Sequence, residues 1–132
     1  MRKITVGVLT PYNDSAEALR TGIASTGMAT RVVLSSEYVS SKSDRSARRL
    51  IEAAPEIIIV EVREPAPALR SLHVLHSALP NTRLLIASTS TDPQLIIEAM
   101  HSGAREFLPL PASNAALLQA FNRHVAENEL AV

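Results

Sequence analysis

Residues 56–88, EIIIVEVREPAPALRSLHVLHSALPNTRLLIAS, hold two apolar runs that flank a longer helical pattern. The runs at 56–62 and 83–88 consist mainly of isoleucine, valine and leucine, which favour strands. Between them, residues 66–79 place leucines three or four positions apart, as on one face of a helix. Because both runs are apolar nearly throughout, they are typical of parallel strands covered by helices on both faces. This stretch predicts a β-α-β unit.

Similar units continue toward both termini. Strands and helices that alternate along the chain form parallel sheets with right-handed crossovers. The sequence therefore predicts an α/β domain with (βα)5 order, a doubly wound, five-stranded parallel sheet in a three-layer α/β/α sandwich. The further strands are predicted at 3–9, 30–36 and 105–110, and the further helices at 15–26, 43–54, 92–104 and 113–130.

Polar residues and glycine mark several predicted helix ends. Ser15, Asp92 and Ser113 stand where a side chain can cap a helix N-terminus. Pro93 follows Asp92 at the first helical position, which proline favours. Gly103 is predicted to end the fourth helix, since glycine adopts the left-handed conformation easily.

The composition narrows the class of protein. The 132 residues suffice for one domain, 1–132, and only 3% are aromatic, so we expect an aliphatic core. Thirteen basic and thirteen acidic residues cancel, which leaves no field to attract nucleic acid or an anionic membrane. The absence of cysteine excludes disulfides and thiolate chemistry. No apolar run approaches the roughly 20 residues of a membrane helix, so we expect a cytoplasmic domain without membrane insertion.

The carboxyl ends of the strands are where ligands bind in doubly wound folds. The segments predicted at this edge are 9–14, 61–64, 88–91 and 108–111. Glu61 stands out among them because a carboxylate directly follows four apolar residues of a strand.

The stretch STSTDPQLIIEAMHSGAREFLPLP (88–111) resembles the corresponding part of response-regulator receiver domains. Receivers have a hydroxyl residue at the end of strand four, a helix that ends in a small residue followed by Gly-Ala, an aromatic residue in strand five, and a Lys-Pro pair. Ser88, Phe107 and Pro111 match the hydroxyl, aromatic and proline positions. The proline four residues after Glu61 also matches one that follows the phosphorylated aspartate of receivers. The resemblance implies a CheY/flavodoxin-like fold with Glu61 at the phosphoacceptor position.

The positions that carry receiver chemistry depart from this pattern. Thr10 and Pro11 stand where receivers hold Mg²⁺ with an acidic pair, and neither supplies the carboxylate that Mg²⁺ prefers. Glu61 replaces the aspartate, and Leu110 replaces the lysine whose charge would pair with an aspartyl phosphate. Only the Ser88 hydroxyl remains. The resemblance thus implies a degenerate phosphoacceptor pocket, no catalytic activity, and no metal or other cofactor.

The run GAREFLPLP (103–111) is similar to the N-terminal atypical receiver of TadZ/CpaE-type pilus-assembly proteins. Those proteins carry a MinD-like ATPase domain behind the receiver, and their receivers are associated with localisation and self-association. No phosphate loop of the form GxxxxGK[ST] occurs in the 132 residues. The resemblance implies an N-terminal fragment that works as an interaction, dimerisation and localisation module in pilus (tad) assembly, with protein partners.

Receivers often dimerise through helix 4, strand 5 and helix 5. Consecutive isoleucines in the fourth predicted helix cannot both pack fully on the sheet, so we expect an exposed apolar patch there. Arg105 and Glu106 are candidates for charge pairs across such a homodimer. The predicted interaction surface consists of Ile97, Met100, Arg105, Glu106, Phe107 and Phe121.

Several interpretations stay open. Glu61 is either a fixed charge that mimics phosphorylation or a solvated acid at a strand end, and for Ser88 hydrogen bonds to nearby backbone are favoured. One alternative for the domain is a two-component receiver phosphorylated at an unorthodox residue. Another is a small-molecule sensor that uses the pocket around Thr10, Tyr12, Glu61, Ser88 and Leu110.

The remaining polar clusters favour ordinary surface roles. His73 and His76 lie on one side of a predicted helix, but no third zinc ligand is evident. His124 is interpreted as a lone surface residue. A solvated mixed face is favoured over a phosphate-bearing partner for the arginines Arg45, Arg48 and Arg49.

Overall fold

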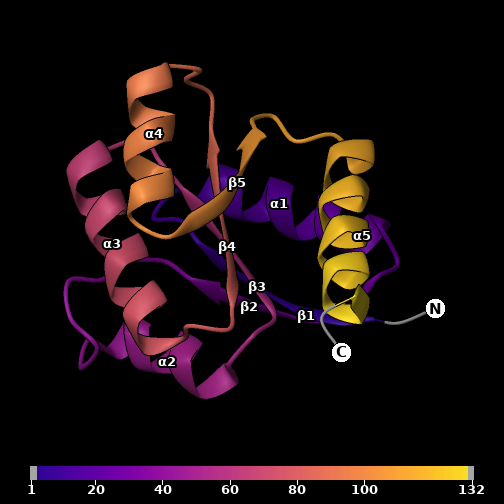
Figure 1. The fold of residues 1–132 in the computed structure, drawn as a ribbon, viewed down its shortest axis with the longest axis horizontal. Coiled ribbons are helices and arrows are strands. Elements are labelled where there is room, and N and C mark those ends of the chain that lie inside the picture. Colours follow the sequence, from indigo (N-terminus) through magenta and orange to yellow (C-terminus); the bar gives the residue numbers. More distant parts are fainter. Residues whose placement is uncertain (1–2, 131–132) are drawn as a thin grey trace.

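The computed structural model describes residues 3–130, whose arrangement Figure 1 shows. Five parallel strands form one sheet in the order β2-β1-β3-β4-β5, and the predicted (βα)5 order is confirmed. No helix within residues 3–130 has the length and apolar content needed to cross a membrane. The strands are β1 (Ile4–Leu9), β2 (Ala29–Ser35), β3 (Ile57–Glu61), β4 (Arg83–Ser88) and β5 (Ala104–Pro109). The helices are α1 (Asn13–Ser25), α2 (Arg45–Ala53), α3 (Pro65–Ala78), α4 (Pro93–His101) and α5 (Asn114–Leu130).

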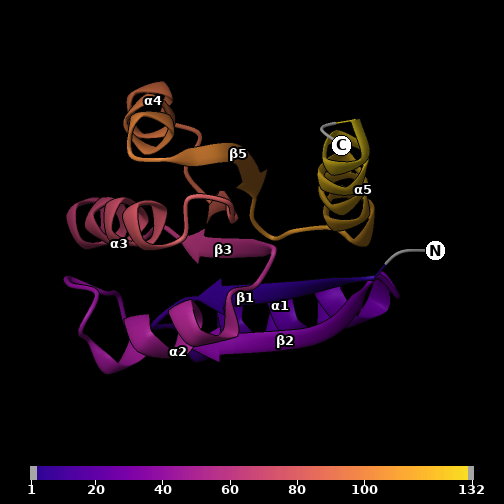
Figure 2. The ribbon, with the colours of Figure 1, turned by 60° about the horizontal axis from the view of Figure 1, so that its bottom comes forward.

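Helices cover both faces of the sheet, as predicted for a three-layer sandwich. The core residues of α1 and α5 form one cluster with the sheet, and those of α2, α3 and α4 form another. Figure 2 shows α2, α3 and α4 on one side of the strands and α5 on the other. Strand order runs outward from β1 in both directions, so the switch point lies between β1 and β3. The chain segments that leave β1 and β3 therefore flank the crevice that such folds use for ligands.

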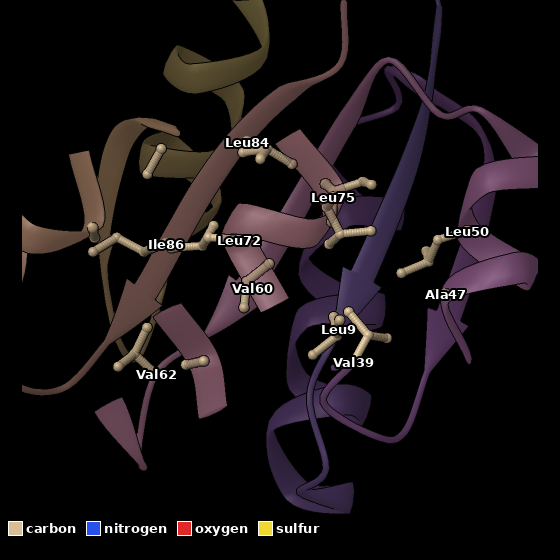
Figure 3. Packing of buried hydrophobic residues seen from close by; sticks show 14 of the residues in the cluster. Leu9, Val39, Ala47, Leu50, Val60, Val62, Leu72, Leu75, Leu84 and Ile86 are labelled. Carbon is tan, nitrogen blue, oxygen red and sulfur yellow. The ribbon is translucent and has the colours of Figure 1, made fainter. Parts of the chain in front are cut away.

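The central position of β3 explains why residues 57–60 are all apolar, without the alternation of a strand that has one exposed face. Ile57 and Ile59 belong to the cluster with α1 and α5, whereas Ile58 and Val60 belong to the cluster with α2, α3 and α4. Figure 3 shows part of this second cluster, including Val60 and, from α3, Leu72. Since successive side chains of a strand point to opposite faces, a strand between two helical layers buries every residue.

Three of the predicted helix ends are confirmed. Asp92 Oδ1 accepts a hydrogen bond from the backbone N–H of Gln94 at 3.1 Å, with Pro93 as the next residue. Ser113 Oγ accepts one from the Ala116 N–H at 3.0 Å. Gly103 follows the C-cap residue Ser102 of α4 and has a φ of 119°, a conformation that favours glycine.

The prediction that Ser15 caps α1 is wrong. The helix already begins at Asn13, and its N-cap Tyr12 makes no side-chain capping bond. The Ser15 hydroxyl instead accepts a hydrogen bond from Arg63 Nη2 at 2.8 Å. A contact with a residue far along the chain has therefore replaced the local capping role.

Candidate functional site

Glu61 ends β3 with its carboxylate buried at the carboxyl edge of the sheet. The residue is only 1% exposed. The hydroxyl of Thr10, which follows β1, donates a hydrogen bond to Glu61 Oε1 at 2.6 Å. On the other side, Arg63 Nε donates to Glu61 Oε2 at 2.7 Å. The interpretation of Glu61 as a solvated acid is therefore wrong, because each carboxylate oxygen has a partner within the chain.

Arg63 ties this acid to the start of α1. Its Nη2 lies 3.3 Å from Asp14 Oδ1, in addition to its bond with Ser15. Its guanidinium carbon lies 3.9 Å from the centre of the Tyr12 ring, which is a cation–π distance. The hydrogen bond to Glu61, together with the nearby negative charges, raises the pKa of Arg63 above its ordinary value. A permanent positive charge thus stands beside the buried acid.

Arg63 was not among the predicted site residues, although the sequence contains a signal for it. Residues two apart on an extended chain point to the same side, so Arg63 follows Glu61 toward the same pocket. A buried carboxylate without a partner is strongly unfavourable. The nearest residue able to neutralise Glu61 is therefore an expected member of the site.

Backbone contacts hold the same corner. Tyr38, between β2 and α2, donates its hydroxyl to the carbonyl oxygen of Glu61 at 2.7 Å. Burial is the main cause that raises the pKa of Tyr38 to about 12, so the phenol remains a donor at neutral pH. The hydrogen bond from the Ser15 backbone N–H is the main cause that lowers the pKa of Asp14, and the charge of Arg63 also lowers it. The Asp14 carboxyl therefore stays charged. The corner is thus fixed by contacts from three separate segments.

The Ser88 hydroxyl forms hydrogen bonds with the backbone around it. The side chain is buried, and Oγ donates to the Val62 carbonyl oxygen at 3.0 Å. The same oxygen accepts a hydrogen bond from the Ser90 N–H at 3.1 Å. These bonds agree with the favoured interpretation of Ser88 as a residue that stabilises the chain after β4.

A pocket of about 270 Å³ remains beside the Glu61–Arg63 pair. Glu61 and Leu110 line it, whereas Thr10, Pro11 and Ser88 do not. Leu110, which the sequence resemblance assigns to the lysine position of receivers, is partly buried against the cluster of α1 and α5. The apolar part of its lining consists of Ala18, Leu19 and residues 110–112. Its charged part consists of Arg63 and the two acids that Arg63 pairs with, Asp14 and Glu61. The predicted pocket residues are thus brought to one edge of the sheet, but they do not all face one cavity.

The residues at this edge do not fit Mg²⁺. The ion prefers several oxygen ligands in near-octahedral geometry, usually including carboxylates. Thr10 and Pro11 supply no carboxylate, and both oxygens of Glu61 already accept hydrogen bonds. The other carboxylate of this edge, Asp14, is also paired with Arg63, at 3.3 Å. The Arg63 guanidinium also places a positive charge next to Glu61 Oε2. No group of three or more metal-binding side chains of the kinds His, Cys, Asp and Glu lies within residues 3–130.

Comparison with solved structures decides the architecture. The chain is similar to a protein described as pilus assembly-related from Burkholderia pseudomallei, with 19% identity and a TM-score of 0.79 over 93% of this chain and 90% of that one. It is also similar to a response regulator from Thermotoga maritima, with 19% identity and a TM-score of 0.76 over 96% and 99%. The chain has the fold of a response-regulator receiver domain.

A third structure with the receiver fold belongs to a protein described as the pilus assembly protein CpaE from Burkholderia thailandensis. Its identity to the chain is 20%, and its TM-score is 0.76 over 93% of this chain and 98% of that one. No protein-family model and no curated protein sequence matches the chain. At such identities the likeness shows the fold alone. It says nothing about the chemistry of the pocket.

The predicted interaction surface is only partly exposed on this receiver fold. Ile97 on α4 is 48% exposed, and it is the one large hydrophobic side chain exposed within the described residues. Met100 and Phe107 are partly buried against the cluster of α2, α3 and α4. Phe121 is 0% exposed, so its placement on the surface is wrong. It lies on the face of α5 that packs on the sheet with Leu117.

Glu106 is bound within the chain and is not a free partner for a second copy. Arg83, largely buried at the start of β4, donates from Nε and Nη2 to Glu106 Oε2 at 3.0 and 2.7 Å. Arg123 of α5 donates to Oε1 at 2.7 Å. Arg105 is exposed, and its Nη2 lies 3.2 Å from Glu127 Oε2. These ion pairs hold α5 to β4 and β5.

His124 belongs to α5 and is not a surface residue, contrary to the prediction. It is 3% exposed. Its Nε2 lies 3.4 Å from Glu56 Oε1 and 3.1 Å from Asn128 Nδ2. The position on the inner face of α5 explains the burial.

Arg63 and Glu61 are expected to be energetically coupled. Arg63→Met should lower the thermal midpoint because it leaves the buried carboxylate with Thr10 as its side-chain donor. Glu61→Gln in the same chain should restore part of the loss, because a neutral amide does not need a cation. Thermal unfolding of the two single variants and the double variant measures this coupling. Additive losses would show that the two side chains do not depend on each other.

Acid should weaken the Arg83–Glu106 network. Burial would raise the pKa of Glu106, but hydrogen bonds from Arg123 and Arg83 outweigh it and lower that pKa below 4.5. A lowered folded-state pKa adds stability above the unfolded pKa and loses it as pH falls through the folded value. Urea unfolding between about pH 6 and pH 3 should therefore show falling stability, with a shallower slope for Glu106→Gln. The exposed control Glu52→Gln should keep the wild-type slope, and an equal slope in all three proteins would contradict the role of Glu106.

Proposed function

We propose that the chain is a receiver-fold module that acts without phosphorylation, through contact with other proteins, in a pilus-assembly machinery. The observation that carries this proposal is the contact of Arg63 with Glu61 at the phosphoacceptor position. The resemblance of the sequence to TadZ/CpaE-type receivers and the pilus-related descriptions of two structural neighbours support the cellular setting.

The chemistry of the pocket supports a role without phosphoryl transfer. Phosphoryl transfer depends on positioning and on neutralising the charge of the transferred group. At this site the cation is an arginine fixed to the acid, and leucine stands in the lysine position. An incoming phosphodonor would have to displace Arg63 before reaching Glu61. The site lacks the parts that would compensate for that displacement.

The same contact argues against Glu61 as a free phosphomimetic charge. Its carboxylate is covered and paired with Arg63 at 2.7 Å. An opposite charge at this distance cancels most of the field that a phosphate would project. The module is therefore proposed to hold one state of the pocket permanently.

The proposed contact surface is a homodimer interface centred on Ile97 of α4. Ile97 is exposed, and Met100 and Phe107 are partly buried, so they offer apolar surface that a second copy can cover. The exposed Arg105 lies on β5 and contributes to the rim. Phe121 is excluded because it belongs to the core, and Glu106 because its carboxylate is already bound.

Treatment with a phosphodonor separates this proposal from the two-component alternative. Acetyl phosphate with Mg²⁺ should leave the intact mass of the protein unchanged, because Glu61 is occupied by Arg63. Intact-mass spectrometry with hydroxylamine treatment detects an acyl phosphate, and a phosphorylated receiver of known activity serves as the positive control. A stoichiometric adduct on Glu61 or on the exposed Asp14 would favour the two-component alternative.

A charge at Ile97 should break the proposed dimer. Ile97→Glu should weaken self-association by about tenfold or more, since it buries a carboxylate in an apolar contact. Sedimentation equilibrium measures the dissociation constant. The matched control is Ala24→Glu, at an exposed position of α1 outside the proposed surface. A monomeric wild-type chain, or a dimer that Ile97→Glu leaves intact, would remove this surface from the proposal.

A further inference from the structure

A second and larger pocket lies on the β2 side of Thr10. Its volume is about 500 Å³, which is within the range of small-molecule sites. It lies where β1 and β2 end, against the first turns of α1 and against α2, and it is separate from the pocket that Glu61 and Arg63 line. The polar residues of its wall are Thr10, Asn13, Glu17, Ser35, Ser36 and Arg49.

Ser35 is the unusual member of this wall. It is 4% exposed, and its hydroxyl is the one buried side-chain polar atom without a hydrogen-bond partner in the described part of the chain. Buried hydroxyls nearly always have partners, because an unpaired one is destabilising. The backbone around it is well paired, and the Ser35 carbonyl oxygen accepts a hydrogen bond from the Thr10 N–H at 3.0 Å. The hydroxyl therefore lacks a partner in a strand end that is otherwise saturated.

Arg49 gives the pocket a free positive charge. It is exposed on α2 and makes no ion pair or hydrogen bond with the described residues, whereas Glu17 is paired with Arg20 at 2.8 Å. A guanidinium binds carboxylate or phosphate groups through two parallel hydrogen bonds. The side chains of Asn13 and Ser36 are likewise unengaged at the same wall. The open donors are thus placed for an anion with further polar groups.

We propose that this pocket binds a small organic anion that carries hydroxyl groups. Its carboxylate or phosphate contacts Arg49, and one of its hydroxyls contacts the Ser35 hydroxyl after rotation about that residue's single side-chain torsion. Such a site is independent of phosphoryl transfer at Glu61. Thr10 belongs to the wall of this pocket and donates to Glu61 at 2.6 Å, so an occupied pocket adjoins the Arg63 corner directly.

Titration of the isotope-labelled protein tests the site, with backbone amide shifts of Ser35, Ser36 and Arg49 as the readout. The probes are glucose 6-phosphate and malate, and uncharged glucose is the control for the anion. Saturable shifts at these residues with either anion, and none with glucose, are expected. Glucose 6-phosphate alone would assign a phosphate ligand, and malate alone a carboxylate ligand.

Two variants tie binding to the named side chains. Arg49→Gln is expected to weaken binding about tenfold or more by loss of the paired hydrogen bonds, and Ser35→Ala should weaken it less. Arg48→Gln is the matched control, because Arg48 is exposed on the same helix but does not line the pocket. Circular dichroism of each variant tests whether it is folded.

Three results would overturn the proposal. One is the absence of shifts with both anions at millimolar concentration, which leaves Ser35 with a water partner alone. Another is equal binding of glucose, which removes the role of the anion. The last is a loss of affinity in Arg48→Gln equal to that in Arg49→Gln, which would point to the general charge of α2.

Discussion

The contact between Arg63 and Glu61 is the constraint on which the rest of this site depends. A carboxylate that is covered from water must be neutralised or paired, because desolvating a lone charge is very costly. Glu61 is covered since β3 runs through the centre of the sheet with helices on both sides. Arg63, two residues further along the chain, pairs with this carboxylate. Its other bonds, to Ser15 and Asp14, fix the start of α1 against the end of β3. The same arginine therefore both pairs with the buried acid and fixes the position of α1.

The receiver fold could be predicted because its signals are local and repeated. Apolar strands such as 57–60 and helix ends such as Asp92–Pro93 and Gly103 each predict their own element, and the order of elements then leaves few topologies. Of the predicted pocket residues, Glu61 and Leu110 line the pocket beside the ion pair, whereas Thr10, Pro11 and Ser88 do not. The sequence did not predict Arg63 as the partner of Glu61, because the partner of a buried acid depends on which side chains meet in space.

The wrong predictions about surface residues also have one cause. Helix α5 was predicted from its spacing, but a helix with a weak apolar stripe does not reveal which face packs on the sheet. The prediction of Phe121 and His124 as surface residues is therefore wrong, because both lie on the buried side of α5. The sequence offers Glu106 for a charge pair across a dimer, because its partner within the chain, Arg83, comes from a different strand. Contacts between distant segments decide each of these cases.

The measurement that tests the central claim most directly is an NMR titration of the Arg63 Nε–H signal with Mg²⁺. The proton bonded to Glu61 Oε2 should give a signal protected from exchange, and millimolar Mg²⁺ should leave its position unchanged, because the arginine already holds the carboxylate. A saturable shift, or loss of this signal as Mg²⁺ binds at Glu61, would contradict the claim. Such a result would mean that the cation site of a receiver is still open in this chain.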